Sequence, residues 1–508
     1  MSDAGPSSAR MGLVAAGAIV LLASARLAFV LAAVGFIGWD TFPLIELNRT
    51  GSFADLLAIS GRPLMGPDGP GLYYRPVLSI LFAIDFWLWG LWEPGYHLTT
   101  LLVFAGAALA VYRLAGHLLA PGALLASLVA LVFFVSHPVH ATVLTMPARR
   151  ADLLCVLFMA TALAEQAGRG TRPHGWSGRV AAFTALALLS KESAFVLPIL
   201  LWVVAFVFSS TTSLPKRAYQ AAVRVAPAFA VVAIIIAVRV LVLGALVGER
   251  PVLESGFAHA AWDMLLKVLR GTLAWGSAAG TTGGPIVAAG VFLLGAALAN
   301  VLAGPVMRRQ SISADLRCAA VGVVWLTAVT VLFAIGLILP PWYIVNPAVP
   351  IALLLAAGAR SVLVLAREPG SRVPAYVALA ALVVVCGISA SRSPLLRGVP
   401  RWVEAADVQR QFLDSLDRDL SAARDGTVVA TTKLPMMFPR APGGSKLGGI
   451  AMLAGYSVQS WTELAFPDRR IRVEYGRDVD LVPLADEVVV HLSGRRTPAA
   501  PSVPRQGR

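Results

Sequence analysis

The sequence predicts a mainly α, polytopic helical membrane protein of about 11 transmembrane helices, followed by a small extracytoplasmic α/β domain. Three observations predict this class. Hydrophobic residues make up 57% of the 508 residues, charged residues make up only 14%, and the mean hydropathy is +0.74, unlike a soluble protein. Apolar runs near the length of a membrane crossing recur along the first 390 residues. After residue 391 the composition becomes that of a soluble domain.

The first predicted transmembrane helix covers residues 11–37. It contains Ala23-Ser24-Ala25, which looks like a signal-peptidase site. Cleavage there would leave only residues 27–37 as an apolar run, which is too short to cross the hydrocarbon core. We therefore expect this helix to be retained.

A long polar segment, residues 38–76, follows as the first outer loop. Its Gly/Pro-rich part, residues 61–70, predicts irregular structure lying on the membrane. Three apolar segments come next, over residues 77–92, 98–118 and 122–136. Three full crossings would place residue 137 in the cytoplasm, against the orientation derived below. Because the first and third are short, we expect one of them to be re-entrant or incomplete.

Short basic loops set the orientation of the remaining helices, since cytoplasmic loops are enriched in Lys and Arg. These loops carry Arg169/Arg172/Arg179, Lys216/Arg217/Arg224, Arg308/Arg309/Arg317 and Arg367/Arg372. The same loops account for the formal net charge of +14, so no nucleic-acid partner is expected. This orientation places the turn at residues 191–192 outside, together with an amphipathic interfacial helix over residues 259–277.

The domain organisation follows from these patterns. Residues 1–391 form the transmembrane domain, and residues 392–493 form the small α/β domain outside the membrane. In the second domain, residues 402–423 predict a polar helix, and residues 427–430 and 487–490 predict short strands. The tail over residues 494–508, rich in Arg, Pro and Ser, is expected to be disordered.

Several polar side chains interrupt the apolar pattern and are candidates for chemistry. Asp40 directly follows the first helix, where a carboxylate could take a proton from an attacking hydroxyl; the alternative is an ordinary helix-end carboxylate. Arg75 could hold a phosphate through two hydrogen bonds, or only extend toward the headgroups. Arg239 lies alone near the outer end of its helix, where a lipid phosphate could be its counter-ion. His97 is typical of a hydrogen-bonded boundary histidine.

Two denser clusters follow, His137-Pro138-Val139-His140 with Arg149-Arg150-Ala151-Asp152, and Ser190-Lys191-Glu192. Polar groups are costly beside a bilayer, so such clusters indicate function. The alternative to a functional role is an ordinary salt bridge within each cluster. Asp152 could pair with Arg149 or Arg150, and Lys191 could pair with Glu192. The two histidines could share one side of a turn, but a zinc site would need a third ligand, so metal binding stays open.

Taken in order, five motifs resemble those of the membrane-embedded GT-C glycosyltransferases. The resemblance is to the protein O-mannosyltransferase-like branch that carries tetratricopeptide repeats in animals. It covers residues 1 to about 360 and rests on short motifs that keep their order and approximate spacing. They are Asp40, Tyr74-Arg75-Pro76, Gly95-Tyr96-His97, His137 to His140 with Arg150-Ala151-Asp152, and Ser190-Lys191-Glu192.

The resemblance implies a GT-C-like transmembrane domain that transfers a sugar, with inversion, from a polyprenyl-phosphate donor to a protein, lipid or envelope-glycan acceptor. It implies a bacterial inner-membrane protein with its active site outside the cytoplasm, and Asp40 as the base. The donor phosphate would be held by Arg75, Arg149, Arg150, Lys191 and Arg239. Supporting roles would fall to His97, His137, His140, Asp152, Glu192 and Tyr343. No cofactor is certain, and a divalent metal stays open.

The chain departs from the family pattern at several positions. The second acid of the first-loop pair is Thr41, and the Glu after the His-Pro-Val-His motif is Thr142. Thr100 and Phe104 replace an Asn and a His, and Trp342-Tyr343 stands where the family often has an Arg. No helical repeat array follows. Two other functions therefore stay open: a transporter or flippase, although no internal duplication is visible, and a non-catalytic scaffold of the same fold.

Overall fold

The structure, a computed structural model, divides into two compact units. It describes residues 6–67, 69, 73–119, 123–169, 178–211, 213–245, 257–273, 314–336, 339–366, 380, 383, 386–387, 390–421, 425–426, 428–431, 434–438, 449–475 and 490–493. The helical unit comprises Met1–Val34 and Asn48–Pro400, and the C-terminal unit comprises Gly35–Leu47 and Arg401–Arg508. A short first-loop segment is thus grouped with the C-terminal residues, and the domain boundary at residue 391 stays a prediction.

Among the described residues up to 135, the helical unit contains five helices. They are α1 (Pro6–Leu31), α3 (Phe53–Ile59), α4 (Pro76–Trp89), α5 (Glu93–Leu119) and α6 (Leu124–Val135). The first helix ends at Leu31, not at residue 37, because the backbone turns there and the Val34 amide donates to the Leu31 carbonyl. Within the described part of residues 61–70 the chain forms no helix or strand, as the sequence predicts.

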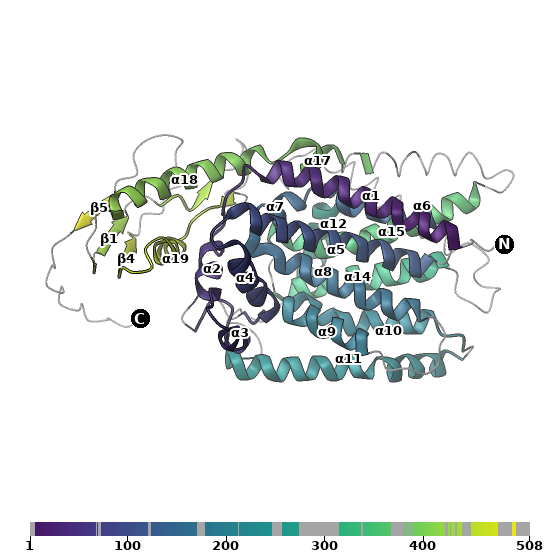
Figure 1. The fold of residues 1–508 in the computed structure, drawn as a ribbon. Helices are drawn as coiled ribbons and strands as arrows, with labels where there is room; N and C mark the ends of the chain where they lie inside the picture. Colours follow the sequence, from purple (N-terminus) through teal and green to yellow (C-terminus); the bar gives the residue numbers. More distant parts are fainter. Residues whose placement is uncertain are drawn as a thin grey trace. The chain divides into compact units, whose positions relative to one another are not determined.

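The described residues contain further helices of this unit. They are α7 (His140–Leu144), η1 (Pro147–Arg149), α8 (Arg150–Gly168), α9 (Gly178–Ser190), η2 (Glu192–Val196), α10 (Leu197–Val207), α11 (Leu214–Leu243), α12 (Phe257–Leu273), α14 (Ala314–Gly336), η4 (Pro341–Ile344), α15 (Val345–Leu365) and α17 (Pro394–Arg397). Many of these helices run side by side, and α8 packs against α5, α9, α10 and α15 (Figure 1). Buried alanines such as Ala107, Ala108 and Ala160 let the helices approach closely.

Six helices of the described residues are long and apolar enough to cross a membrane. They lie within Arg10–Leu31, Glu93–Leu119, Pro147–Gly168, Leu214–Leu243, Ala314–Gly336 and Pro341–Val364. Helices α4 and α6, of 14 and 12 residues, are too short at about 1.5 Å per residue to cross about 30 Å of hydrocarbon. The short lengths expected for these two segments are confirmed, whereas the total of about 11 crossings stays a prediction.

The amphipathic helix expected over residues 259–277 forms as α12, over Phe257–Leu273. Asp263 and Lys267 form an ion pair of 2.6 Å one turn apart, and both side chains are half-exposed. The helix itself is therefore confirmed. Residues 274–277 lie outside the described part, and the interfacial position of α12 stays a prediction.

The C-terminal unit combines helices with short strands. Its elements are α18 (Pro400–Ser421), β1 (Val428–Thr431), β2 (Met437–Phe438), β3 (Ile450–Ala451), α19 (Gly455–Ala465), β4 (Arg472–Tyr475) and β5 (Val490–Ser493), and α2 (Thr41–Asn48) begins within its first-loop segment. Strand β1 is central, parallel to β4 and antiparallel to β5, and β2 pairs with β3 (Figure 1).

Most elements expected after residue 391 form close to their predicted positions. The polar helix predicted over 402–423 is α18, and the strand predicted over 427–430 is β1, shifted by one residue. The strand predicted over 487–490 begins instead at Val490, as β5. Residues 487–489 and the tail over 494–508 lie outside the described part.

Candidate functional site

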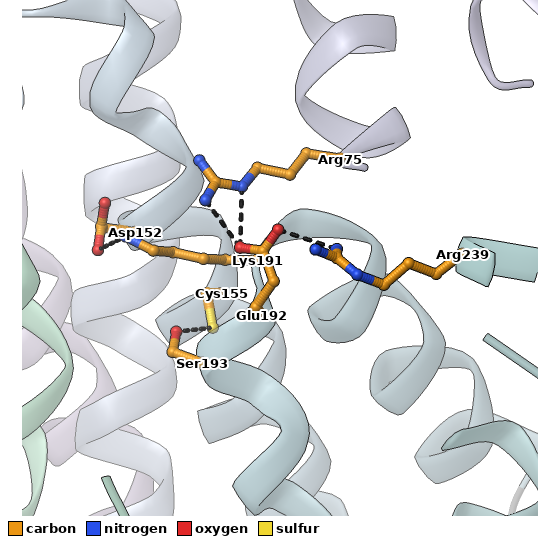
Figure 2. Close-up of polar contacts among 7 residues, drawn as sticks. All are labelled: Arg75, Asp152, Cys155, Lys191, Glu192, Ser193 and Arg239. Atoms are coloured by element: carbon orange, nitrogen blue, oxygen red, sulfur yellow. Dashed lines mark hydrogen bonds and ion pairs between the residues drawn. The ribbon is translucent and has the colours of Figure 1, made fainter. Parts of the chain in front are cut away.

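A cluster of five charged side chains lies in the helical unit, and Glu192 is at its centre (Figure 2). Arg75, which precedes α4, donates from Nε and Nη2 to Glu192 Oε2 at 3.1 and 2.7 Å. Arg239, near the end of α11, donates to Oε1 of the same carboxylate at 3.0 Å. Arg239 therefore has a protein counter-ion, which corrects the expectation that it stands alone. The side chain of Arg75 is 11% exposed, that of Arg239 is 9% exposed, and that of Glu192 is 25% exposed.

The other two members of the cluster are Lys191 and Asp152. Lys191 Nζ lies 2.5 Å from Asp152 Oδ1, with both side chains buried, and 3.7 Å from the centre of the Tyr343 ring. Asp152 thus pairs with Lys191 and not with Arg149 or Arg150, and Lys191 and Glu192 do not pair with each other. We refer to Arg75, Asp152, Lys191, Glu192 and Arg239 as the charge cluster.

The local backbone explains why neighbouring residues have separate partners. Helix α9 ends at Ser190, and Lys191 is extended, with φ −164° and ψ 147°, before η2 begins at Glu192. In extended backbone, successive side chains point in opposite directions. The break between the two helices therefore directs Lys191 toward α8 and Glu192 toward the two arginines.

The charge cluster carries excess positive charge, because its three cationic side chains outnumber its two carboxylates. Burial disfavours charge on the Arg75 guanidinium, but the Glu192 carboxylate outweighs it, so the pKa of Arg75 lies above its usual range. Burial lowers the pKa of the Lys191 amine, and the Asp152 carboxylate opposes that effect. A partly exposed group of this composition can accept an additional anion.

Arg149, the last residue of η1, and Arg150, the first residue of α8, have different contacts. The Arg149 guanidinium stacks on the Trp342 ring, 3.7 Å from its centre. The Arg150 side chain is fully buried and is paired with Asp85 of α4, which also accepts a hydrogen bond of 2.6 Å from Thr99. Arg150 therefore meets a carboxylate of the protein where the family resemblance implied a donor phosphate.

Asp85 is a functional candidate that sequence reasoning missed. It lies in the middle of an apolar segment, and an ionisable residue in such a place marks a partner or a function. Its partner Arg150 also lies against the rings of Phe82 and Tyr96, with its guanidinium carbon 4.7 and 5.7 Å from their centres. This aromatic cage and the ion pair join α4, α5 and α8.

The three histidines in the motifs of the family resemblance are buried among backbone carbonyls. His97 contacts the carbonyls of Val34 and Leu144 at 2.9 and 3.2 Å. His137 contacts the Thr272 carbonyl at 3.2 Å, and His140 contacts the Phe134 carbonyl at 2.7 Å. Such contacts hold loops and helix ends together. Across the described ranges, no group of three or more His, Cys, Asp or Glu side chains could hold a metal ion.

Burial lowers the pKa of His137 to about 3 and that of His140 to about 4. Both rings are therefore neutral in the folded protein at neutral pH, whereas in the unfolded chain they take up protons below about pH 6.5. Stability is consequently lost as the pH falls below about 6.5. We expect the thermal unfolding midpoint of the purified protein to fall between pH 7 and pH 4.5, and to fall less in a His140→Gln variant.

The matched control for this pH dependence is His259→Gln, because His259 is exposed on α12. Its midpoint should follow the wild-type curve at every pH. If His140→Gln also followed the wild-type curve, the protonation of His140 would contribute nothing to the loss of stability in acid.

Asp40 lies in the C-terminal unit, in the turn between Gly38 and α2. Gly38 has a φ of +103°, which favours glycine and lets the chain reverse before Trp39 and Asp40. The Tyr456 hydroxyl, on the first turn of α19, donates to Asp40 Oδ1 at 3.0 Å. No local sequence signal indicates Tyr456, which is 416 residues from Asp40.

Comparison with known proteins gave similarities only to solved structures. No protein-family model matches the sequence, and none of the curated proteins matches it. The chain is similar to the oligosaccharyltransferase of Archaeoglobus fulgidus tethered with an acceptor peptide, with 13% identity over 89% of this chain and a TM-score of 0.43. It spans 63% of the length of that protein. It is also similar to ArnT from Cupriavidus metallidurans bound to undecaprenyl phosphate, with 16% identity over 92% of this chain and 90% of that chain, and a TM-score of 0.39.

Proposed function

We propose that this protein is an integral membrane glycosyltransferase that moves a sugar from a polyprenyl-phosphate donor to an acceptor hydroxyl outside the cytoplasm, with inversion. The observation that carries this proposal is the charge cluster, in which Arg75 and Arg239 share the Glu192 carboxylate and Lys191 pairs with Asp152, so that its three cations outnumber its two carboxylates. The five ordered motifs of the sequence support it. We place the protein in a bacterial inner membrane.

The excess positive charge suits the leaving group of this reaction. As the bond between the anomeric carbon and the phosphate oxygen breaks, its electron pair leaves with the polyprenyl phosphate, whose negative charge increases. Cationic side chains fixed in place stabilise such developing charge more than they stabilise the intact donor. Arg75 and Arg239 are the members best suited to this role, since their shared partner Glu192 is one-quarter exposed.

The acceptor half of the reaction requires a base. The acceptor oxygen would attack the anomeric carbon from the face opposite the phosphate, and its proton would pass to Asp40. This assignment rests on the place of Asp40 directly after the first helix and on its ionisable carboxylate. The acceptor would be a protein, a lipid or an envelope glycan.

Two measurements test the proposed function. Native mass spectrometry of the purified protein should detect a co-purified polyprenyl phosphate that carries a sugar. Vesicles that contain the protein and this donor, labelled in the sugar, should then form a glycosidic product on an added acceptor extract. Movement of the lipid-linked sugar across the vesicle membrane without any glycosidic product would support a flippase instead. Binding of the lipid with neither activity would support a non-catalytic scaffold.

Removing one cation from the charge cluster should weaken donor binding. We expect Arg239→Gln to raise the KM for the polyprenyl-phosphate donor by about 10- to 100-fold and to lower kcat as well, since a hydrogen bond to a charged group contributes about 1.5–3 kcal/mol. The measurement is the initial rate of transfer as a function of donor concentration in detergent micelles.

The control for this substitution is Arg224→Gln on the same helix, which removes an equal charge away from the cluster. It should leave the donor KM at the wild-type value. Equal KM values for Arg239→Gln and the wild type would remove Arg239 from the donor-binding group.

A further inference from the structure

We infer that Tyr456 is a positioning residue for Asp40, so that the C-terminal unit takes part in sugar transfer by orienting the base. The inference rests on the proposed function of Asp40. Its central observation is the hydrogen bond of 3.0 Å from the Tyr456 hydroxyl to Asp40 Oδ1, which joins the first-loop segment of this unit to α19.

The backbone around Asp40 is fastened by the same part of the chain. The Trp39 indole donates to the Met436 carbonyl at 2.9 Å, and the Ser457 hydroxyl donates to the Trp39 carbonyl. The Gln409 amide of α18 donates to the Phe36 carbonyl. These bonds fix the backbone on the N-terminal side of Asp40, and the Tyr456 bond acts on the carboxylate itself.

The start of α19 is built to present these two side chains. The Ala454 amide donates to the Ser457 hydroxyl at 3.0 Å, a bond that stabilises the first turn of the helix. The side chains of Tyr456 and Ser457 therefore both extend from a fixed turn. Tyr456 contacts the Asp40 carboxylate, and Ser457 contacts the carbonyl of the preceding residue, Trp39.

The chemistry of a general base explains what this bond contributes. A carboxylate has two oxygens, and only one has to accept the proton of the acceptor hydroxyl. The hydrogen bond from Tyr456 to Oδ1 restricts rotation of the carboxylate. Small errors in the placement of a reacting group cost large factors in rate, so the loss of this restriction should lower kcat.

The test is a kinetic comparison in the full-length protein. We expect Tyr456→Phe, which removes only the hydroxyl, to lower kcat for sugar transfer about 10-fold and to leave the donor KM unchanged. The matched control is Tyr219→Phe, which removes the hydroxyl of an exposed tyrosine on α11 and should behave as the wild type.

A double-mutant cycle separates positioning from general structural damage. We expect Asp40→Glu to retain a carboxylate base and part of the transfer activity, while its longer side chain moves the carboxylate away from the Tyr456 hydroxyl. Adding Tyr456→Phe to Asp40→Glu should therefore lower kcat by less than about 2-fold, although it lowers wild-type kcat about 10-fold. Equal losses in the two backgrounds, or wild-type kcat in Tyr456→Phe, would overturn the inference and leave Asp40 as the base. Full activity of Asp40→Asn would instead overturn the assignment of the base and this inference with it.

Discussion

Asp40→Asn should abolish most sugar transfer, with a loss in kcat of about 10²- to 10⁴-fold, the usual contribution of a positioned general base. Asparagine has nearly the same shape as aspartate, and its oxygen can still accept the Tyr456 hydrogen bond. It cannot take the acceptor proton, however. The substitution therefore removes the chemistry and preserves the local structure. The measurement is product formation from the labelled polyprenyl-phosphate donor in proteoliposomes.

The control for Asp40→Asn is Asp55→Asn, a change at an exposed carboxylate in the same predicted loop. Asp55 belongs to the first turn of α3, where it contacts Ser52, and its substitution should leave kcat unchanged. Donor binding to Asp40→Asn should also stay at the wild-type level, since the proposed phosphate-holding side chains are untouched. Transfer at the wild-type rate by Asp40→Asn would show that another group serves as the base.

Local patterns in the sequence were sufficient to predict several elements. The helical period over residues 259–277 predicts α12, and the polar helical pattern over residues 402–423 predicts α18. The short apolar segments 77–92 and 122–136 predict that one of them does not fully cross a membrane, and the structure gives short helices, α4 and α6, for both. In each case the signal lies within about 20 neighbouring residues, where periodicity and length are informative.

The partners in the charge cluster could not be predicted in the same way. Lys191 and Glu192 stand out in the sequence, but their partners Asp152 and Arg75 are 39 and 117 residues away and are brought close only by helix packing. Opposite charges that are neighbours in sequence suggest local salt bridges, which the structure does not form. The end of α1 at Leu31 likewise depends on a turn whose residues are still apolar.

Asp85 differs from these cases because a signal for it was present. A carboxylate in the middle of residues 77–92 needs a partner, and an arginine is the most suitable partner for a buried carboxylate. The sequence could therefore have predicted an ion pair for Asp85, although not that Arg150 forms it. The ion pair with Asp85 raises the question of the role of Arg150. Arg150 could join helices of the fold, or it could bind the donor phosphate.

Arg150→Met should destabilise the protein by about 3–5 kcal/mol, because it leaves the Asp85 carboxylate buried without its counter-ion. The side chains of both residues are fully buried, so water cannot replace the lost partner. Asp85→Leu should be harmful to a similar extent, because it leaves the guanidinium buried among the rings of Phe82 and Tyr96. The measurement is the free energy of unfolding by denaturant titration in micelles. The control is Arg113→Gln, which breaks a half-exposed pair with Glu165 and should cost at most about 1 kcal/mol.

The double variant Arg150→Met with Asp85→Leu distinguishes a structural role of Arg150 from donor binding. Replacing both members of a buried ion pair with apolar side chains of similar volume is often neutral for stability. If Arg150 serves only to join α4 to α8, the double variant should regain most of the lost stability and should bind the donor with the wild-type KM. If Arg150 instead holds the donor phosphate, the double variant should fold and still show a raised donor KM. Since the Asp85 carboxylate already occupies the Arg150 guanidinium, we expect the first result.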